Sequence, residues 1–396
     1  MWFVQAGFSP IPGPAESFPD HSRIAVYDPE VGTFRLYNVP GDRNGVVGLA
    51  WDDVRKRVWF TEAARNAGGF FPVVALRARL ASFDPERIAP DAQFDFASAA
   101  TCLPGAQGKP GACSDVATRP CLRDSDCVLA GQVCPPGAID DSACWHEYEL
   151  PPEFPSFLPA HLVADPGGAL WFTDYWVGNS IGRLDPATGA FTRFPLAAPE
   201  AKASCGYQGC SCFCAAGDAS CTPCDAYCCQ ILNLDSAPWF IAQGGGGELW
   251  FTEYLNGAVG RLPRESTGDA RCQDLSADGS NPCIREWIVP GIDHPHQTVH
   301  SLAVDGAGRV WFTQGSVQDQ PSDPATVGYV PSDQGPMRLF APLSLYPFTS
   351  DGTNCVGPVG RFVSFNGAGI AVDPGNGEVW FADYCRRRLG RLTRLP

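Results

Sequence analysis

One pattern recurs along this chain and constrains its fold more than any other feature. An apolar segment, usually ending in Asp, leads through a Gly-containing turn into Trp-Phe-Thr and a polar, mostly acidic residue. Copies lie at residues 48–62, 161–174, 240–253, 301–314 and 369–383, and a truncated copy, MWFVQ, opens the chain. Units this short cannot bury both of their faces alone, so we expect the copies to pack against one another.

Two further short segments follow most copies, the first of them marked by a Gly or an Arg, as in IGRLDPATG (181–189) and VGRLPRES (259–266). All four segments of a unit are rich in β-branched and aromatic residues and are separated by Asp-Pro and Gly turns, which predicts four short strands, a to d. Four-stranded units in radial repetition are the blades of a β-propeller. We therefore predict an all-β chain that forms a single β-propeller of about six blades over residues 1–396.

The two terminal blades are incomplete in this prediction. The first copy lacks strand a and the last lacks strand d, and both contain strands b and c, so they are not halves of one blade. Three explanations remain open: the ring closes imperfectly, residues upstream of Met1 are missing, or another chain supplies strands. Unpaired edge strands invite the last of these.

Composition fits a turn-rich β protein and excludes two classes of partner. The chain has 43 Gly and 37 Pro residues with 11% aromatic residues, which indicates turns rather than disorder. The net charge is −15 without a basic block, so nucleic acid is not an expected partner, since phosphate binding needs clustered Lys and Arg. We expect no membrane span, because no apolar run approaches the roughly 20 residues that a helix needs to cross a bilayer.

Eighteen cysteines fall into local groups of even number, which predicts disulfides and an oxidising, extracellular or periplasmic compartment. The segment 102–144 is a six-Cys insertion in a c–d loop, and 205–229 is an eight-Cys insertion in a d–a loop. MWFVQAGFSP lacks the regions of a signal peptide, so we expect a mature or trimmed form. The candidate disulfide cysteines are Cys102, Cys113, Cys121, Cys127, Cys134, Cys144, Cys205, Cys210, Cys212, Cys214, Cys221, Cys224, Cys228, Cys229, Cys272, Cys283, Cys355 and Cys385.

The eight-Cys segment has two interpretations. Its C-x-C and C-x-x-C spacings are compatible with a thiolate metal or iron–sulfur site. The segment contains no His and its context is that of a secreted protein, so we favour disulfides. The sequence CTPCD lacks the His that follows the second Cys in a haem attachment site, so no c-type haem is expected.

The stretch GIDHPHQTVHSLAVD (291–305) holds three of the six histidines. It leads into an inner strand, which places His300 at the mouth of the predicted channel. Asp293, His294, His296 and His300 could bind Zn²⁺ or Cu²⁺, or His300 could be catalytic. The simpler interpretation, which we favour, is a solvated polar loop that caps the channel.

Acidic residues also recur directly after Trp-Phe-Thr. Because Glu62, Asp174 and Glu253 repeat from blade to blade, we interpret them as hydrogen-bonding groups at strand ends. Their convergence near one face could still bind a cation, so a divalent ion (Mg, Ca or Zn) is a candidate cofactor.

The segments WFTEYLNGAVGRL and LWFTDYWVGNSIGRLDPATGAFTRFPL resemble the streptogramin B lyase (virginiamycin B lyase) family. The resemblance covers all six copies outside the Cys-rich insertions. It implies a β-propeller and, as activity, an Mg²⁺-assisted elimination that opens a cyclic depsipeptide ester. The implied site has a His before an inner strand, Glu-Pro-His leading into the following blade, and a Glu after that blade's strand b.

His300 matches the first of these positions, and the others depart from the family. Asn366, Gly367 and Ala368 stand where Glu-Pro-His is expected, and Tyr384, next to Asp383, stands where the Glu is expected. Elimination needs a positioned base and charge stabilisation. We therefore expect a secreted binding or assembly module whose partners are other protein chains or copies of itself. The alternative is a metal-assisted C–O lyase with its site around His300.

Overall fold

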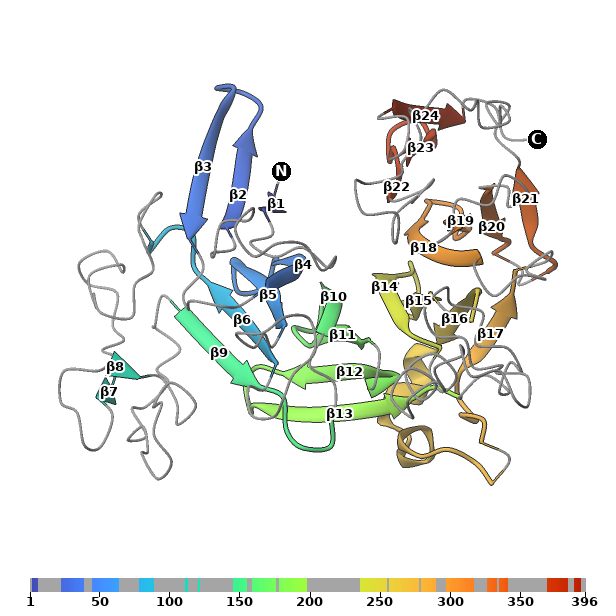
Figure 1. Cartoon of the computed structure of the whole chain (residues 1–396), viewed down its shortest axis with the longest axis horizontal. Helices are drawn as coiled ribbons and strands as arrows, with labels where there is room; N and C mark the ends of the chain where they lie inside the picture. The colour runs from blue at the N-terminus through green and yellow to red at the C-terminus, as the bar shows by residue number, and fades with distance from the viewer. Residues whose placement is uncertain are drawn as a thin grey trace, which may run out of the picture. The chain divides into compact units, whose positions relative to one another are not determined.

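A computed structural model describes residues 2–5, 23–38, 45–63, 78–88, 111–112, 120–121, 145–154, 159–175, 178–197, 236–254, 256–277, 279–289, 297–316, 326–332, 335–340, 369–383 and 388–392 (Figure 1). These residues confirm the predicted fold class, a β-propeller of six blades. Helical structure among them is limited to short 3-10 turns such as η3 (Arg264–Gly268) and η4 (Ala270–Gln273).

The first three blades use the first half of the chain. Blade 1 contains β1 (Trp2–Gln5), β2 (Arg23–Asp28) and β3 (Thr33–Asn38). Blade 2 contains β4 (Gly45–Asp52), β5 (Arg57–Ala63), β6 (Arg79–Phe83) and β9 (Trp145–Glu149). Blade 3 contains β10 (Pro159–Ala164), β11 (Leu170–Asp174), β12 (Ser180–Asp185) and β13 (Ala190–Pro195). A two-stranded pair, β7 (Gly111–Ala112) and β8 (Pro120–Cys121), lies within the six-Cys insertion.

The remaining blades follow in the same order. Blade 4 contains β14 (Pro238–Gln243), β15 (Leu249–Glu253), β16 (Ala258–Leu262) and β17 (Arg285–Ile288). Blade 5 contains β18 (Gln297–Val304), β19 (Val310–Ser316), β20 (Thr326–Val330) and β21 (Arg338–Phe340). Blade 6 contains β22 (Gly369–Val372), β23 (Val379–Asp383) and β24 (Arg388–Leu392).

Within every blade the strands pair in chain order, and blades 1 and 6 have three strands in the described part of the chain. The sequence therefore predicted which strands these terminal blades contain. The chain forms two compact units, residues 1–170 with 184–191 and residues 171–183 with 192–396.

In blades 3, 4 and 6 the Trp-Phe pair of strand b and the Gly-Arg pair of strand c interlock. The Phe ring of strand b covers the Gly of strand c so closely that a Cβ on Gly260 would lie 2.2 Å from Phe251. The Arg that follows this Gly stacks over the Trp, with the Arg261 guanidinium 5.7 Å from the Trp250 ring centroid. The motif is thus explained by packing within the blade, and Trp250 and Phe312 also belong to the apolar cluster between blades 4 and 5.

The Thr of the same motif joins one blade to the next. The hydroxyl of Thr252 accepts a hydrogen bond from the amide of Phe240 in its own blade and donates one to the carbonyl of His300 in blade 5, both 3.0 Å long. Thr61 donates in the same way to Ala160, over 2.8 Å. A buried hydroxyl therefore fixes the spacing of neighbouring inner strands, which explains why Thr recurs in this position.

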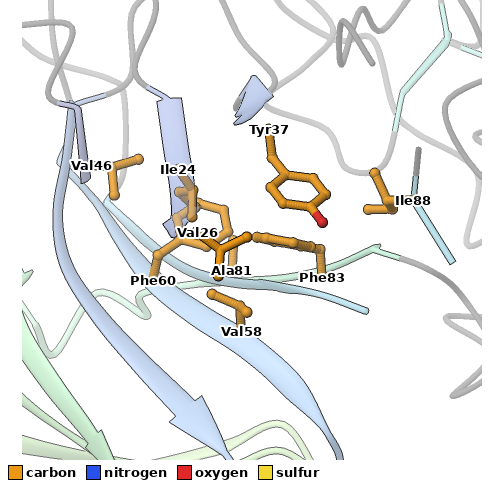
Figure 2. Close-up of a cluster of buried hydrophobic side chains, with 9 residues drawn as sticks. All are labelled: Ile24, Val26, Tyr37, Val46, Val58, Phe60, Ala81, Phe83 and Ile88. Carbon is orange, nitrogen blue, oxygen red and sulfur yellow. The ribbon is translucent and has the colours of Figure 1, made fainter. Parts of the chain in front are cut away.

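Apolar side chains fill the space between blades. Figure 2 shows the cluster between blades 1 and 2, with side chains from both sheets pointing toward one another. Its buried members are Ile24, Val26, Tyr37, Val46, Val58, Phe60, Ala81, Phe83 and Ile88. The equivalent clusters of the second unit lie between blades 4 and 5 and between blades 5 and 6. Burial of this surface is the main favourable term that holds consecutive blades together.

Cys272 and Cys283 form a disulfide in the connection between β16 and β17. Cys272 is fully buried, and its carbonyl accepts a 2.9 Å hydrogen bond from the side chain of Asn281, which also donates to the carbonyl of Pro195. The disulfide therefore belongs to a connection that is anchored to the preceding blade.

None of the described helices is long and apolar enough to cross a membrane.

Candidate functional site

His300 lies inside strand β18 rather than in the loop before it. The sequence placed residues 293–300 in a loop, but the described strand begins at Gln297, and Thr298 and Val299 pair with Gly315 and Gln314. The pairing is irregular between Val299 and Leu302. His300 therefore sits at a local irregularity of an inner strand, where β-structures commonly redirect a side chain.

The imidazole of His300 is buried against an aromatic ring. It is 5% exposed, its Nε2 lies 3.1 Å from the Thr298 hydroxyl, and its ring meets Tyr254 edge-on at 4.8 Å between centroids. Burial lowers the pKa of His300 from 6.5 to about 3, because the charged imidazolium loses its hydration. The side chain is consequently neutral at neutral pH.

Tyr254 belongs to a group of four rings, the ring cluster, which also contains Tyr175, Trp239 and His300. Tyr175 meets Trp239 edge-on at 4.9 Å, and Tyr254 lies 6.2 Å from Tyr175 and 6.3 Å from Trp239. Tyr254 and His300 are buried, whereas Tyr175 and Trp239 are half-buried. The ring cluster thus offers partly accessible aromatic surface, supported from beneath by buried rings.

The repeat dictates where these rings lie. Tyr175 and Tyr254 follow the acidic residue that ends strand b in blades 3 and 4, while Trp239 and His300 lie near the start of strand a in blades 4 and 5. The ends of strands b and the starts of strands a meet at the same face of a propeller. Three consecutive blades therefore contribute rings to one place.

Asn179 holds the segment that leads to Trp239. Its side-chain oxygen accepts hydrogen bonds from the backbone amide and hydroxyl of Ser236, at 2.9 and 2.8 Å, and from the amide of Ala237 at 3.3 Å. Ala237 has a φ of 53°, a conformation that costs a non-glycine residue of order 1–3 kcal/mol and persists only where surrounding contacts impose it. These contacts fix the approach to the ring cluster.

Glu253 precedes Tyr254 and is fully buried. Side chains alternate between the faces of a strand, and Thr252 and Tyr254, on either side of Glu253, both contact His300. Burial and the neighbouring Glu286 carboxyl raise the pKa of Glu253 well above its usual range. Its Oε2 accepts a 2.8 Å hydrogen bond from Asn256.

The other recurring acids also contact groups of their own blades. Asp174 accepts a 3.0 Å hydrogen bond from the Ser180 hydroxyl, and Glu62 lies 3.6 Å from the Arg79 guanidinium. The contact of Asp174 agrees with the interpretation of the acids as hydrogen-bonding groups at strand ends, whereas the contact of Glu62 is an ion pair.

Several predicted site residues fall outside the described part of the chain. Asp293, His294 and His296 do so, as do all the cysteines of the eight-Cys insertion, Cys355 and Cys385. Their metal and disulfide roles stay predictions. The same is true of Asn366, Gly367, Ala368 and Tyr384, the positions at which the chain departs from the lyase family.

One group among the described residues brings three metal-ligand atoms together: Asp269, Cys272 and Cys283. It does not fit an ion, because the two sulfurs are joined in the disulfide and the carboxylate of Asp269 forms a close ion pair with Arg271.

Sequence reasoning missed Tyr175, Trp239 and Tyr254 as site residues. A signal was present, because Tyr follows the acid in WFTDY and WFTEY. The repeat drew attention to the acids, whereas one residue later the ring of Tyr254 meets His300 and the ring of Tyr175 meets Trp239.

No protein-family model and no curated protein matches the sequence. Among solved structures the chain is similar to a streptogramin B lyase, with 18% identity over 98% of this chain and 97% of the other and a TM-score of 0.41. It is also similar to virginiamycin B lyase from Staphylococcus aureus, with 17% identity over 100% of both chains and a TM-score of 0.43. Kuenenia stuttgartiensis hydrazine synthase is 9% identical over 94% of this chain and 70% of the other, with a TM-score of 0.48.

Proposed function

We propose that this chain is a secreted, disulfide-rich binding module that uses the ring cluster to hold a partner. The observation that carries the proposal is the half-buried Tyr175–Trp239 pair, which rests on the buried Tyr254 and His300. Rigid aromatic surface gives large contact area at low conformational cost. Tyr and Trp are also the residues most enriched where binding energy concentrates.

The state of His300 supports binding over catalysis. A general base works best when its pKa lies near the operating pH, and the pKa of this imidazole is about 3. Its Nε2 also faces the Thr298 hydroxyl. We therefore assign His300 the role of supporting the ring of Tyr254.

The net negative charge of the chain and the aromatic faces of the ring cluster together favour a partner with a cationic side chain next to an apolar one. The chain carries a net charge of −15, which attracts positively charged partners at long range. The faces of Trp and Tyr bind ammonium and guanidinium groups. A protein chain that presents Lys or Arg beside an apolar residue satisfies both conditions.

Site-specific photo-crosslinking tests the proposal. With p-benzoylphenylalanine in place of Tyr175, the full chain should form a discrete covalent adduct with one partner protein in extracellular material of its source. The adduct should be lost in a Trp239→Ala background. The same photoreactive residue in place of Val31, which is 68% exposed in blade 1, serves as the control. Equal adducts from both positions, or no adduct from position 175, would overturn the proposal.

The alternative activity has a direct assay. Quinupristin, the compound present in a structure of catalytically inactive virginiamycin B lyase from Staphylococcus aureus, serves as the substrate. The chain, supplied with Mg²⁺ and quinupristin, should give no linear product above the rate without protein, and His300→Ala should behave in the same way. Linear product that forms with the unmodified chain and disappears in His300→Ala would favour the lyase instead.

A further inference from the structure

In blades 2 and 3, the acid that ends strand b is balanced by a positive charge from its own sheet. In blade 2, Glu62 pairs with Arg79, whose guanidinium lies 3.6 Å from the Glu62 carboxylate and 3.4 Å from that of Glu147 on strand d. In blade 3, the hydroxyl that donates to Asp174 also accepts a 3.1 Å hydrogen bond from the Nε of Arg193. A nearby cation allows a buried carboxylate to stay charged.

Blades 1, 5 and 6 follow the same rule of charge balance. Blades 1 and 5 have a neutral side chain at the position of the acid, Gln5 and Gln314, which needs no counter-charge. In blade 6, Asp383 at the end of β23 pairs with Arg388 at the start of β24. These blades therefore have either a basic residue opposite the acid or no acid at all.

Blade 4 places two carboxyl groups together and lacks the balancing charge. Glu253 pairs with Ala258, as the acid of blade 2 pairs with Arg79. Glu286 lies on strand d opposite Gly260, in the same register as the strand d carboxylate of blade 2. Alanine thus stands at the position from which blade 2 supplies its guanidinium.

The carboxyl groups of Glu253 and Glu286, the carboxyl pair, lie within hydrogen-bonding reach of one another. Glu253 is fully buried. Its Oε2 accepts the hydrogen bond from Asn256, whereas its Oε1 has no hydrogen-bond partner. Among the described residues, no Lys or Arg forms an ion pair with either carboxyl group. A buried acceptor without a partner is costly, so the carboxyl pair lacks one positively charged group.

The groups around the carboxyl pair are oxygen donors. The hydroxyl of Ser236 also approaches the Glu253 carboxyl, and its single hydrogen is directed at Asn179 Oδ1, 2.8 Å away. Its oxygen therefore keeps lone pairs for a ligand. Carboxylates and hydroxyls, without His or Cys, are the ligands that hard divalent cations prefer. Glu286 is half-buried, which leaves a way in from solvent.

We propose that Glu253 and Glu286 bind a hard divalent cation, Ca²⁺, which takes the place that the Arg79 guanidinium has in blade 2. The Ser236 oxygen and water complete the set of ligands, because Ca²⁺ accepts six to eight oxygens in flexible arrangements. The carboxyl pair is distinct from the ring cluster, and the inference does not depend on the function proposed there.

A proton shared between the two carboxyl groups is the competing explanation. Burial raises the pKa of both groups, so a proton would also relieve their repulsion. The two explanations differ in one respect, because only a cation site gains stability from added Ca²⁺.

Isothermal titration calorimetry with CaCl₂ tests the proposal on the full oxidised chain at neutral pH, after EDTA has removed bound metals. We expect a binding event with a dissociation constant of about 0.1–1 mM, as in the Ca²⁺ sites of extracellular modules. Glu286→Gln should weaken this event at least tenfold, because it removes a charged ligand and keeps the shape of the side chain. Glu265→Gln removes an exposed acid of the same blade, so this matched control should leave the event unchanged.

Ala258→Arg tests whether a guanidinium can replace the ion, as in blade 2. This variant should lose the same binding event. Ca²⁺ should raise the unfolding temperature of the unmodified chain, since an ion that binds only the folded chain stabilises it, and Ala258→Arg should lose most of this shift. In EDTA, Glu286→Gln should unfold at a temperature no lower than that of the unmodified chain, because the substitution removes the repulsion between the carboxyl groups.

Two results would overturn the proposal. Ca²⁺ binding that is equal in the unmodified chain and in Glu286→Gln, or absent from both, would mean that the carboxyl pair shares a proton. A binding event that Glu286→Gln removes and Ala258→Arg leaves intact would place the ion away from the space between the two carboxyl groups. Circular dichroism checks the fold of each variant, and Glu253→Gln takes the place of Ala258→Arg if the larger side chain prevents folding.

Discussion

At the scale of single residues, the Gly of each Gly-Arg pair is determined by the Phe ring that covers it. We expect Gly260→Ala to lower the free energy of unfolding by about 1–3 kcal/mol, the usual cost of overpacking, because its Cβ would lie 2.2 Å from Phe251. Gly306→Ala is the matched control, since no atom lies within 4 Å of its Cβ position. Urea unfolding measures both, and equal shifts would contradict the packing explanation.

His300 makes stability depend on pH in a predictable direction. Its folded pKa of about 3 lies below the unfolded value of 6.5, so between these values only the unfolded chain binds the proton. The stabilising effect is complete above pH 6.5 and decreases as the pH falls toward 3, by up to about 1.4 kcal/mol per pH unit.

The variant His300→Gln should lack this contribution. We expect its free energy of unfolding to decrease less than that of the unmodified chain when the pH falls from about 7 to about 5. The raised pKa of Glu253 acts in the opposite direction, because its contribution is lost as the pH rises, but it is present in both proteins and cancels in the difference. Parallel pH profiles would show that His300 is solvated in the folded chain.

At this scale the sequence predicted which side chains are distinctive better than it predicted which side chains touch one another. It identified His300 as a distinctive side chain at the mouth of the predicted channel, and it identified Glu62, Asp174 and Glu253 as strand-end groups. It could not predict that Tyr254 meets His300, because the two rings are 46 positions apart and come together only through the pairing of blades 4 and 5.

At the scale of elements, the Thr of strand b connects neighbouring inner strands. Thr252→Val should destabilise the chain by about 1–3 kcal/mol, because the partly buried amide of Phe240 and the buried carbonyl of His300 lose a partner. Thr267→Val is the control, since the Thr267 hydroxyl bonds to the Arg264 carbonyl at an exposed site. Chemical denaturation compares the two, and an equally small effect would contradict the connecting role.

The disulfide between β16 and β17 yields a second element-scale prediction. Replacing Cys272 and Cys283 together by Ala should cost roughly 2–3 kcal/mol, the value expected for a loop of this length, and should speed hydrogen exchange in η3 and η4. Mass spectrometry of the exchanging protein measures the local effect. Unchanged exchange in both helices would mean that Asn281 and its contacts hold the connection without the covalent bond.

The sequence predicted which segments form strands, but it did not predict where strand β18 begins. The polar residues of DHPHQTVH (293–300) indicate a loop. However, Thr298 and Val299 are β-branched and extend the pairing of β18 with β19. The local sequence could not decide between a loop and a strand, because the strand depends on hydrogen bonds to β19, and that pairing is determined by the fold.

At the scale of the whole molecule, the repeat predicted the number of blades and the three strands that the described part of the chain contains in each terminal blade, because period and strand order are properties of sequence. The exposure of particular side chains in these blades, such as Leu389 and Trp380, is provided only by the structure.

Local stability should therefore differ between blades 4 and 6. Strand β15 has neighbours on both sides in a four-stranded sheet, and all five of its residues are buried. Strand β23 also has two neighbours, but one of them, β24, is an edge strand beside the exposed Leu389 and Trp380. Segments with fewer buried contacts open at lower free energy, so the amides of β23 should exchange at least tenfold faster than those of β15. Equal protection of the two strands would mean that the edge of blade 6 is already covered.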